Sequence, residues 1–380
     1  MATGDNYPVL MGFDKAAPGG VATLDASGNV PFEQLGNVSG ENLLINAYFA
    51  NMDSIIDQRK GYVLVKDKPY YNDIPPFSDE TLVDIVTVYT TVYSVTIGTD
   101  YTSFKLSTAS DAETYYAAPA DVVRGYVGAK YTIDRWQNTS SGGVVLIEDD
   151  GLRFAPIIYF SQTLELPFGA LKGKTVSFSV LTEEGLVWGW GEVPYSAPDE
   201  YTTFIELKYN SGASARFAYS INSKAFLVDV MRAKEVSCPK VIAAKLELGS
   251  TQTLAHQDAD GNWVLNDPPP NRALELAKCQ RYFYGSLTAR LFCTHRGSSN
   301  DIWTVVCSFP ETMRTSPAVP KAKLRVNVLG TTDYDTTIAP DSIKSIGTNT
   351  NGISHIRIDT NILNAEKIYN CSFENISAEL

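Results

Sequence analysis

The stretch Thr175-Val176-Ser177-Phe178-Ser179-Val180 decides the fold because polar and apolar side chains alternate strictly along it. Successive side chains of an extended chain point to opposite faces, so Val176, Phe178 and Val180 share one face of a strand. The same period of two recurs around this stretch, with turn residues between the segments. The other expected strands of this region cover residues 142–147, 151–160, 201–209, 215–221, 225–231 and 241–248. Short strands at this spacing predict an antiparallel sandwich or jelly roll.

Two further β regions flank this one. On the N-terminal side, Asp84-Ile85-Val86-Thr87-Val88-Tyr89-Thr90-Thr91-Val92-Tyr93-Ser94-Val95-Thr96-Ile97 alternates in the same way and predicts short strands of a small barrel at 61–125. On the C-terminal side, strands are expected at 287–293, 301–309, 322–329, 352–359 and 369–377. We therefore predict a mainly β chain, with a jelly-roll-like sandwich at 41–60 and 126–265, the inserted barrel, and a C-terminal β-sandwich at 285–380.

A proline-rich linker and one helix separate the last two modules, at 266–284. The run Asp267-Pro268-Pro269-Pro270 stops regular structure, because proline removes a backbone donor and fixes an extended path. A helix is expected at 271–284, with Asn271 as its N-cap. One face of this helix would carry Ala273, Leu276, Ala277, Gln280 and Tyr284. Such a thin apolar stripe is a weak core element in a monomer, but it suits packing against copies of the same helix.

Composition excludes several classes of protein. The 380 residues carry a net charge of −12, which argues against nucleic acid as a partner. Hydrophobic residues make up 44% of the chain, enough for a packed core. No apolar run reaches the roughly 20 residues that cross a bilayer, and the first residues resemble no signal peptide, so neither membrane insertion nor secretion is expected. Residues 1–40 are rich in glycine and poor in large apolar groups, which fits either a flexible tail or an attachment and oligomerisation segment.

Catalytic, metal and cofactor sites are not indicated by any motif. The five cysteines lack a C-x-x-C pair and are interpreted as small buried hydrophobes, and the three histidines are far apart. The segment Asp258-Ala259-Asp260-Gly261-Asn262 resembles a calcium loop but lacks the closing glutamate, so a turn is expected. Glu148-Asp149-Asp150 also fits a solvated turn. The sequence shows no nucleophile elbow, phosphate loop or metal-binding helix.

Eight short pieces of sequence, taken in order, carry a resemblance to a known family. They are Gly20-Val21-Ala22-Thr23-Leu24-Asp25, Gly28-Asn29-Val30-Pro31, Asn42-Leu43-Leu44-Ile45-Asn46, Asp57-Gln58-Arg59, Arg124-Gly125-Tyr126, Tyr131-Thr132-Ile133-Asp134-Arg135-Trp136, Ala244-Lys245-Leu246-Glu247-Leu248-Gly249 and Lys278-Cys279-Gln280-Arg281-Tyr282-Phe283. The ordered set resembles tail fibres or receptor-binding proteins of bacteriophages that infect gut Gram-positive bacteria. One departure is the 61–124 unit, which separates two of the pieces. That unit is similar to an SH3-like barrel and is interpreted as an insertion.

The resemblance implies a homotrimeric, non-catalytic fibre in the virion tail, assembled in the host cytoplasm. Its segment 1–40 would dock onto other tail or baseplate proteins, the middle sandwich would be similar to a carbohydrate-binding module, and the C-terminal sandwich would bind host cell-surface polysaccharide. Two alternatives stay open: a tail-associated glycan-degrading enzyme, and a purely structural baseplate or collar component.

Two sets of residues are candidates for glycan binding. The first lies in loops of the C-terminal sandwich, where polar and aromatic groups suit hydroxyl-rich ligands: Asp333, Tyr334, Asp335, Asn349, Thr350, Asn351 and His355. The second is Trp188 and Trp190, which share one strand face at i and i+2. The competing interpretations are that the loops are ordinary turns and that both indoles are core. Asp134-Arg135-Trp136 is expected to anchor the sandwich, with Trp136 buried and an ion pair at its rim.

Overall fold

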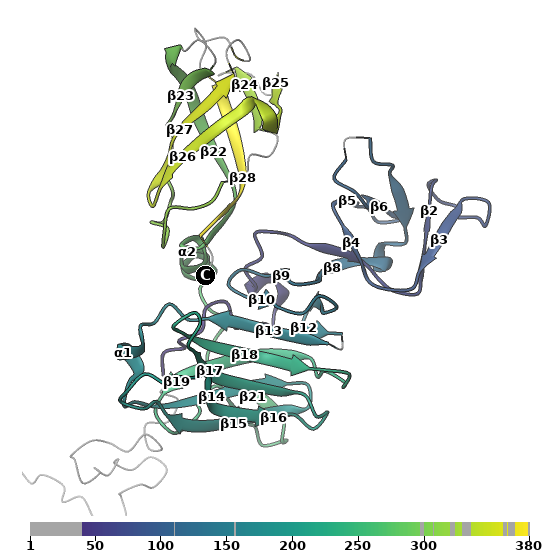
Figure 1. Ribbon diagram of the computed structural model, residues 1–380. Helices are drawn as coiled ribbons and strands as arrows, with labels where there is room; N and C mark the ends of the chain where they lie inside the picture. Colours follow the sequence, from purple (N-terminus) through teal and green to yellow (C-terminus); the bar gives the residue numbers. More distant parts are fainter. Residues whose placement is uncertain are drawn as a thin grey trace, which may run out of the picture.

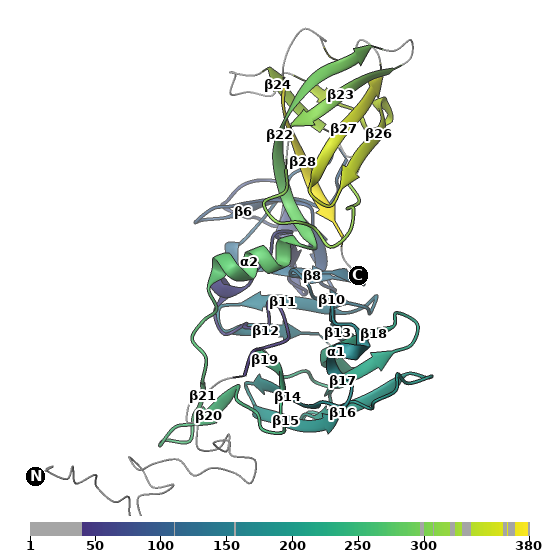
Figure 2. The same ribbon diagram turned by 90° about the vertical axis from the view of Figure 1, so that its left-hand side faces the viewer.

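The computed structural model describes residues 40–109, 111–155, 157–296, 300–306, 308–319, 324–328, 336–359, 363 and 369–378. Within these residues the chain is mainly β, with several antiparallel sheets, as the alternating pattern predicts. Figures 1 and 2 show a sandwich of two sheets, with a small β unit at its side and a further sheet on the opposite side of helix α2 (Arg272–Gln280). In the part of the chain that is described, no helix combines the length and the apolar character needed to span a bilayer.

Two sheets face each other across the main hydrophobic core. The first has the order β15 (Gly185–Glu192), β14 (Thr175–Thr182), β19 (Val241–Leu248), β12 (Gly151–Phe154), β11 (Val144–Glu148), β8 (Val122–Val127), β1 (Tyr62–Leu64) and β4 (Thr90–Val92). The second has the order β16 (Thr202–Lys208), β17 (Ser214–Ser220), β18 (Ala225–Ala233), β13 (Ile158–Thr163), β10 (Gln137–Asn138) and β9 (Lys130–Tyr131). The alternation in β14 has the predicted effect, since Val176, Phe178 and Val180 are fully buried between the sheets.

The segment before the first strand also belongs to this core. Leu44, Phe49 and Ile55 are buried in it, and Tyr48 forms a β-bridge with Ala243 of β19. Residues 151–160, expected as one strand, form the separate strands β12 and β13. The reason is Ile157, whose φ of 68° is left-handed and turns the chain from one sheet into the other.

A five-stranded sheet lies beside the sandwich. Its order is β3 (Leu82–Val86), β2 (Lys68–Tyr71), β7 (Tyr115–Ala117), β6 (Thr102–Lys105) and β5 (Ser94–Ile97). Its small core of Phe104, Ala117 and Val92 also includes Leu64 and Val122, which lie on the paired strands β1 and β8. The chain therefore leaves the sandwich and returns to it at neighbouring positions.

The C-terminal sheet surrounds a second core. Its order is β25 (Thr336–Ile338), β24 (Leu324–Val328), β28 (Tyr369–Ser377), β22 (Phe283–Arg296), β23 (Asn300–Val306), β27 (Gly352–Asp359) and β26 (Ile343–Asn349). A hairpin of β20 (Ala255–Gln257) and β21 (Trp263–Leu265) precedes the prolines. One-turn helix α1 (Phe168–Leu171) and 3-10 turns at Met52–Ser54, Pro119–Asp121 and Pro340–Ser342 complete the described elements.

Helix α2 is shorter than predicted. It begins after Asn271, whose side chain caps it by accepting from the backbone N–H groups of Ala273 and Leu274, but it ends at Gln280. Tyr284, expected on the helix, lies in β22 instead, because the C-terminal sheet begins at Phe283. The buried residues of the helix are Glu275 and Cys279, which are not part of the expected stripe. Of that stripe, Leu276, Ala277 and Gln280 are half-buried and Ala273 is exposed.

Candidate functional site

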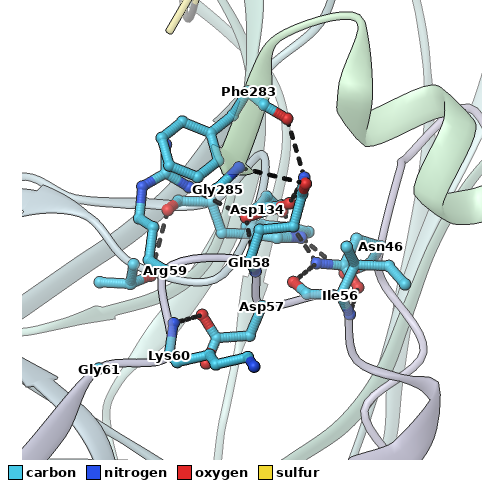
Figure 3. A network of polar contacts seen from close by, with 12 residues as sticks. Asn46, Ile56, Asp57, Gln58, Arg59, Lys60, Gly61, Asp134, Phe283 and Gly285 are labelled. Carbon is cyan, nitrogen blue, oxygen red and sulfur yellow. Dashed lines mark hydrogen bonds and ion pairs between the residues drawn. The ribbon is translucent and has the colours of Figure 1, made fainter. Parts of the chain in front are cut away.

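Four of the sequence pieces that carry the resemblance meet at one place in the fold. Figure 3 shows this joint, which we define by Asn46, Gln58, Arg59, Asp134 and Phe283. The Asn46 side chain donates to the carbonyls of Ile56 and Asp134 and accepts from the Ile56 N–H. These contacts tie together segments that are far apart in sequence, so the joint is built by long-range hydrogen bonds rather than by one element.

Asp134 is the acidic centre of the joint. Its fully buried carboxylate pairs with the Arg59 guanidinium at 3.1 Å and accepts from the Gln58 amide at 2.5 Å. The same Gln58 amide donates to the Phe283 carbonyl at 2.8 Å, and the Arg59 guanidinium lies 3.6 Å from the centroid of the Phe283 ring. Residues of the sandwich thus hold the first residue of β22 (Figure 3).

Arg135 strengthens the joint from its other side. Its guanidinium lies 3.6 Å from the centroid of the Tyr282 ring and donates to the Thr163 carbonyl at 2.6 Å. The expected position of Asp134 and Arg135 at the rim is wrong, because both are buried, with exposed fractions of 0% and 2%. Trp136 is buried as predicted. Burial raises the pKa of Tyr282 to about 12; a hydrogen bond to Glu165 adds to this rise, and the Arg135 charge opposes it.

The piece Arg124-Gly125-Tyr126 and helix α2 are tied in beside the joint. Asp57 pairs with Arg124 at 2.7 Å and accepts from the Tyr126 hydroxyl. Burial, together with the Asp57 charge, raises the pKa of Tyr126 above its usual range. The Asn46 N–H donates to the buried Glu275 carboxylate of α2 at 2.9 Å. Because these side chains bond to one another, the pieces form a framework that positions the C-terminal sheet.

Of the loop residues predicted to bind glycans, Asn349, Thr350, Asn351 and His355 belong to the part of the chain that the structure describes. Asp333, Tyr334 and Asp335 lie outside the described residues. Asn349, Thr350 and Asn351 form the turn that connects β26 to β27.

The turn at Asn349–Asn351 is partly engaged within the chain. The Thr350 and Asn351 carbonyls accept from the N–H groups of Met313 and Phe309, both at 2.8 Å, and Asn349 accepts from the Asn351 N–H. His355 lies away from the turn, packed against Gly347 of the neighbouring strand, with its Nδ1 3.1 Å from the Ser354 hydroxyl. These contacts leave Asn349 exposed but do not gather the residues into one concave site.

Trp188 and Trp190 do share one face, and that face is exposed. Their exposed fractions are 46% and 55%, so the competing core interpretation is wrong for both. Gly189, which lies between them, faces the core: a methyl group added there would lie 3.2 Å from Leu207 of the opposite sheet. Since alternate residues point in opposite directions, the two indoles project outward from β15, an edge strand of the sheet.

Two rows of polar side chains continue from these indoles across the next two strands, where they are buried. Ser179 pairs with Trp188 and Ser177 with Trp190, and β19 places Lys245 and Glu247 in the same rows. Lys245 and Glu247 are 1% exposed because the chain after β19 covers them. The covering segment pairs Asp267 with Lys245 at 2.8 Å, and its Thr253 N–H donates to Glu247 at 2.7 Å.

Sequence reasoning missed Trp263, which lies on the same face. It is 37% exposed and belongs to β21, where Trp263 and Leu265 point alike. Leu265 packs on Leu181 and Leu186 of the sheet, so Trp263 also points towards the sheet and lies against Gly185, the first residue of β15. The sequence indicated only a turn at 258–262 next to Trp263, and a turn does not show which surface the neighbouring residues cover.

A groove of about 930 Å³ opens beside Trp263. Its lining includes Tyr48, Glu183, Asn262, Asn266 and Asp267. Burial raises the pKa of the Tyr48 hydroxyl above its usual range. Among the described residues that line the groove, the charged ones are Glu183 and Asp267, both acidic. The groove thus offers hydroxyl, amide and carboxylate groups next to an indole.

Other candidate groups have structural partners. The segment 258–262 is the turn that the sequence predicts, with Asp258 accepting from the N–H groups of Asp260 and Asn262, which lowers the pKa of its carboxyl. Cys238, Cys279 and Cys371 are buried, in line with the interpretation of the cysteines, while Cys293 is half-buried. Within the described ranges, no group of three or more acidic, histidine or cysteine side chains is arranged to hold a metal ion.

Comparisons of the chain with protein-family models, with curated proteins and with solved structures give no match.

Proposed function

We propose that this chain is a bacteriophage tail fibre or receptor-binding protein that attaches the virion to host cell-surface glycans without cleaving them. The observation that carries the proposal is the outward-facing pair Trp188 and Trp190 on edge strand β15. Indole faces stack on the apolar faces of sugar rings, and about 7 Å separates residues i and i+2 of a strand, which suits neighbouring rings of one chain. The resemblance in the sequence supports the same class of protein.

The finer features of the fold belong to this proposal. We assign the two facing sheets to a jelly roll similar to a carbohydrate-binding module, residues 61–125 to an inserted SH3-like barrel, and residues 285–380 to a receptor-binding sandwich. Segment 1–40 attaches the fibre to tail or baseplate proteins. The loops that contain Asp333, Tyr334, Asp335, Asn349, Thr350, Asn351 and His355 form a second contact region for the host polysaccharide.

A homotrimer is part of the proposal. Helix α2 turns Glu275 and Cys279 towards its own chain and leaves Leu274 64% exposed. An exposed leucine next to exposed Ala273 suits contact with the same helix of two other copies near a common axis.

Binding to whole host cells tests the proposed function. The wild-type protein is expected to bind, extracted cell-surface polysaccharide to compete, and the double substitution of Trp188→Ala with Trp190→Ala to reduce binding at least tenfold. Tyr93→Ala is the matched control, because Tyr93 is a similarly exposed aromatic residue (58%) on the side unit. A non-catalytic fibre releases no reducing sugar during the assay; release of reducing sugar would favour the enzyme instead.

A second candidate function is a structural role in which this face contacts other virion proteins. It is favoured by Gly40, which follows the proposed attachment segment and donates to the Thr253 hydroxyl on the same face at 3.3 Å. In that case the double tryptophan variant would bind cells normally and fail to assemble into virions. Quantifying the variant in purified particles distinguishes the two functions.

A further inference from the structure

The exposed tryptophans of this chain lie along one strand face. Of its five tryptophans, Trp136 and Trp303 are buried in the two large cores, with exposed fractions of 0% and 1%. The other three, Trp188, Trp190 and Trp263, are each more than one-third exposed and lie on the outer face of the first sheet. Solvent-exposed indoles are uncommon, so their alignment along β15 calls for a ligand that spans them.

The order of the three rings follows from the strand. Trp263 lies against Gly185 at the start of β15, Trp188 lies three residues further on, and Trp190 two residues beyond that. At about 3.3 Å per residue, the row from the Gly185 end to Trp190 is about 17 Å long. That length exceeds one sugar ring and requires an extended chain.

The chemistry of the row changes along it. At the Trp263 end the groove adds the Tyr48 hydroxyl and the Asn262 and Asn266 amides, whereas the Trp188 and Trp190 end is open. Acidic groups stand at both ends, Glu183 and Asp267 in the groove and Glu192 beyond Trp190. Asp267 is paired with Lys245, and Glu183 lies 3.6 Å from Arg153. Hydroxyl groups of a neutral sugar can donate to these carboxylates, whereas the described lining of the groove offers no cationic side chain to a polyanion.

We propose that Trp263 and its groove form a further subsite, which binds one end of an unbranched, uncharged saccharide chain whose remainder stacks on Trp188 and Trp190. This inference rests on the proposed glycan-binding function and extends it to ligand length and charge. The groove fixes the end of the chain by hydrogen bonds, and the open indoles hold the following units by stacking.

The experiment uses the full chain on an array of neutral and anionic linear oligosaccharides of graded length. Wild-type protein is expected to prefer neutral chains, with affinity that rises from disaccharides to longer oligomers. Trp263→Ala is expected to weaken binding of the longer chains about tenfold and to leave disaccharide binding at Trp188 and Trp190 unchanged. Trp263→Phe keeps an aromatic face and is expected to restore most of the loss.

The outcomes separate this inference from the function on which it rests. If Trp263→Ala binds long neutral chains as wild type does while Trp188→Ala weakens them, the further subsite is wrong and glycan binding stands. A preference of wild-type protein for anionic chains also overturns the inference. If wild-type protein binds no saccharide, or if Trp188→Ala and Trp190→Ala have no effect, the proposed function fails as well. Unchanged thermal unfolding of each variant, with Tyr93→Ala alongside, confirms that the sheet is intact.

Discussion

At the scale of single residues, the joint depends on side chains that are buried and charged at once. Asp134 is fully buried and is balanced by Arg59, which is itself stacked on Phe283. A buried ion pair adds little over an apolar contact of the same shape, but removal of one partner leaves an uncompensated charge. Substitutions at the joint should therefore cost far more than substitutions in surface ion pairs.

Arg59→Ala is expected to lower the free energy of unfolding by about 3 kcal/mol, because the Asp134 carboxylate loses its guanidinium partner. Urea unfolding monitored by tryptophan fluorescence measures the change. Lys208→Ala is the control, since its pair with Glu206 is exposed and should contribute less than about 1 kcal/mol. Equal losses in the two variants would contradict the role given to the joint.

Tyr282 makes stability depend on alkaline pH. An ordinary tyrosine loses its proton near pH 10, whereas the folded-state pKa of Tyr282 is about 12. Below pH 10 the Tyr282 hydroxyl is protonated in both the folded and the unfolded state. Between pH 10 and 12 it loses its proton in the unfolded state only, which stabilises the unfolded state and lowers the free energy of unfolding. Tyr282 should thus contribute a fall of up to about 1.4 kcal/mol per pH unit in that window.

The matching variant is Tyr282→Phe, which should show a shallower loss of stability from pH 10 to 12. Its stability at pH 7 is the internal control. At that pH the variant should lose only the hydrogen bond to Glu165, which lowers the free energy of unfolding by about 1 kcal/mol. Parallel pH profiles for the two proteins would show that the phenol does not titrate late.

At the scale of elements, helix α2 transmits the position of the sandwich to the C-terminal sheet. Asn271 fixes its first turn, Glu275 accepts from Asn46, and Phe283 begins β22 three residues after the helix ends. A short helix of this kind depends on its cap, because few turns are available to share the cost of fraying.

Asn271→Ala is expected to destabilise the protein by about 1 kcal/mol, since two backbone N–H groups lose their acceptor. Asn271→Asp keeps the acceptor and should be close to neutral. Thermal unfolding followed by circular dichroism compares the three proteins. If alanine and aspartate behaved alike, the cap would not contribute.

Local patterns predicted the elements better than their surroundings. The period of two located β14, β19, β27 and β28 because each strand's own residues specify its two faces. It did not say which face of β15 was solvent, since that depends on Gly189 meeting Leu207 from the opposite sheet. The predicted helix was too long for a similar reason. Tyr284 fits the helical stripe, but in the fold it belongs to β22, where it pairs with Ile376 of β28.

The candidate sites were still harder to predict, because they depend on strand order. The turn at 349–351 is held by the N–H groups of Phe309 and Met313, which no local pattern of the sequence links to it. Asp134 and Arg59 are likewise brought together only by the fold. The position of Trp263 was not predicted, because no local sequence pattern links it to Gly185.

At the scale of the whole molecule, the chain has separate cores joined by few connections. The sandwich, the side unit and the C-terminal sheet each have their own buried cluster. The ligand face proposed on β15 and the C-terminal loops therefore lie on different bodies (Figures 1 and 2). Assembly of copies would multiply both kinds of contact, which raises the overall strength of weak attachments.

Leu274→Asp is expected to weaken the proposed trimer, because it puts a charge on the exposed face of α2. Sedimentation equilibrium should show the variant shifting to monomer at concentrations where wild type is trimeric. Ile97→Asp is the control, an exposed apolar residue of β5 in the side unit. A wild-type protein that is monomeric at micromolar concentration would contradict the assembly.

The place where the side unit joins the sandwich has a consequence for how such a chain can change over generations. Leu64 of β1 and Val122 of β8 pair directly, so the excursion between them begins and ends at adjacent points of one sheet. Two crossovers in the gene, one after β1 and one before β8, would exchange the whole unit, β4 included. The β1–β8 pair, the joint and the C-terminal sheet would stay in register. A replacement domain would have to bury Leu64 and Val122, because their apolar side chains pack in the core of the side unit. The fold therefore allows a different small domain to replace the side unit by recombination at this one pair of strands.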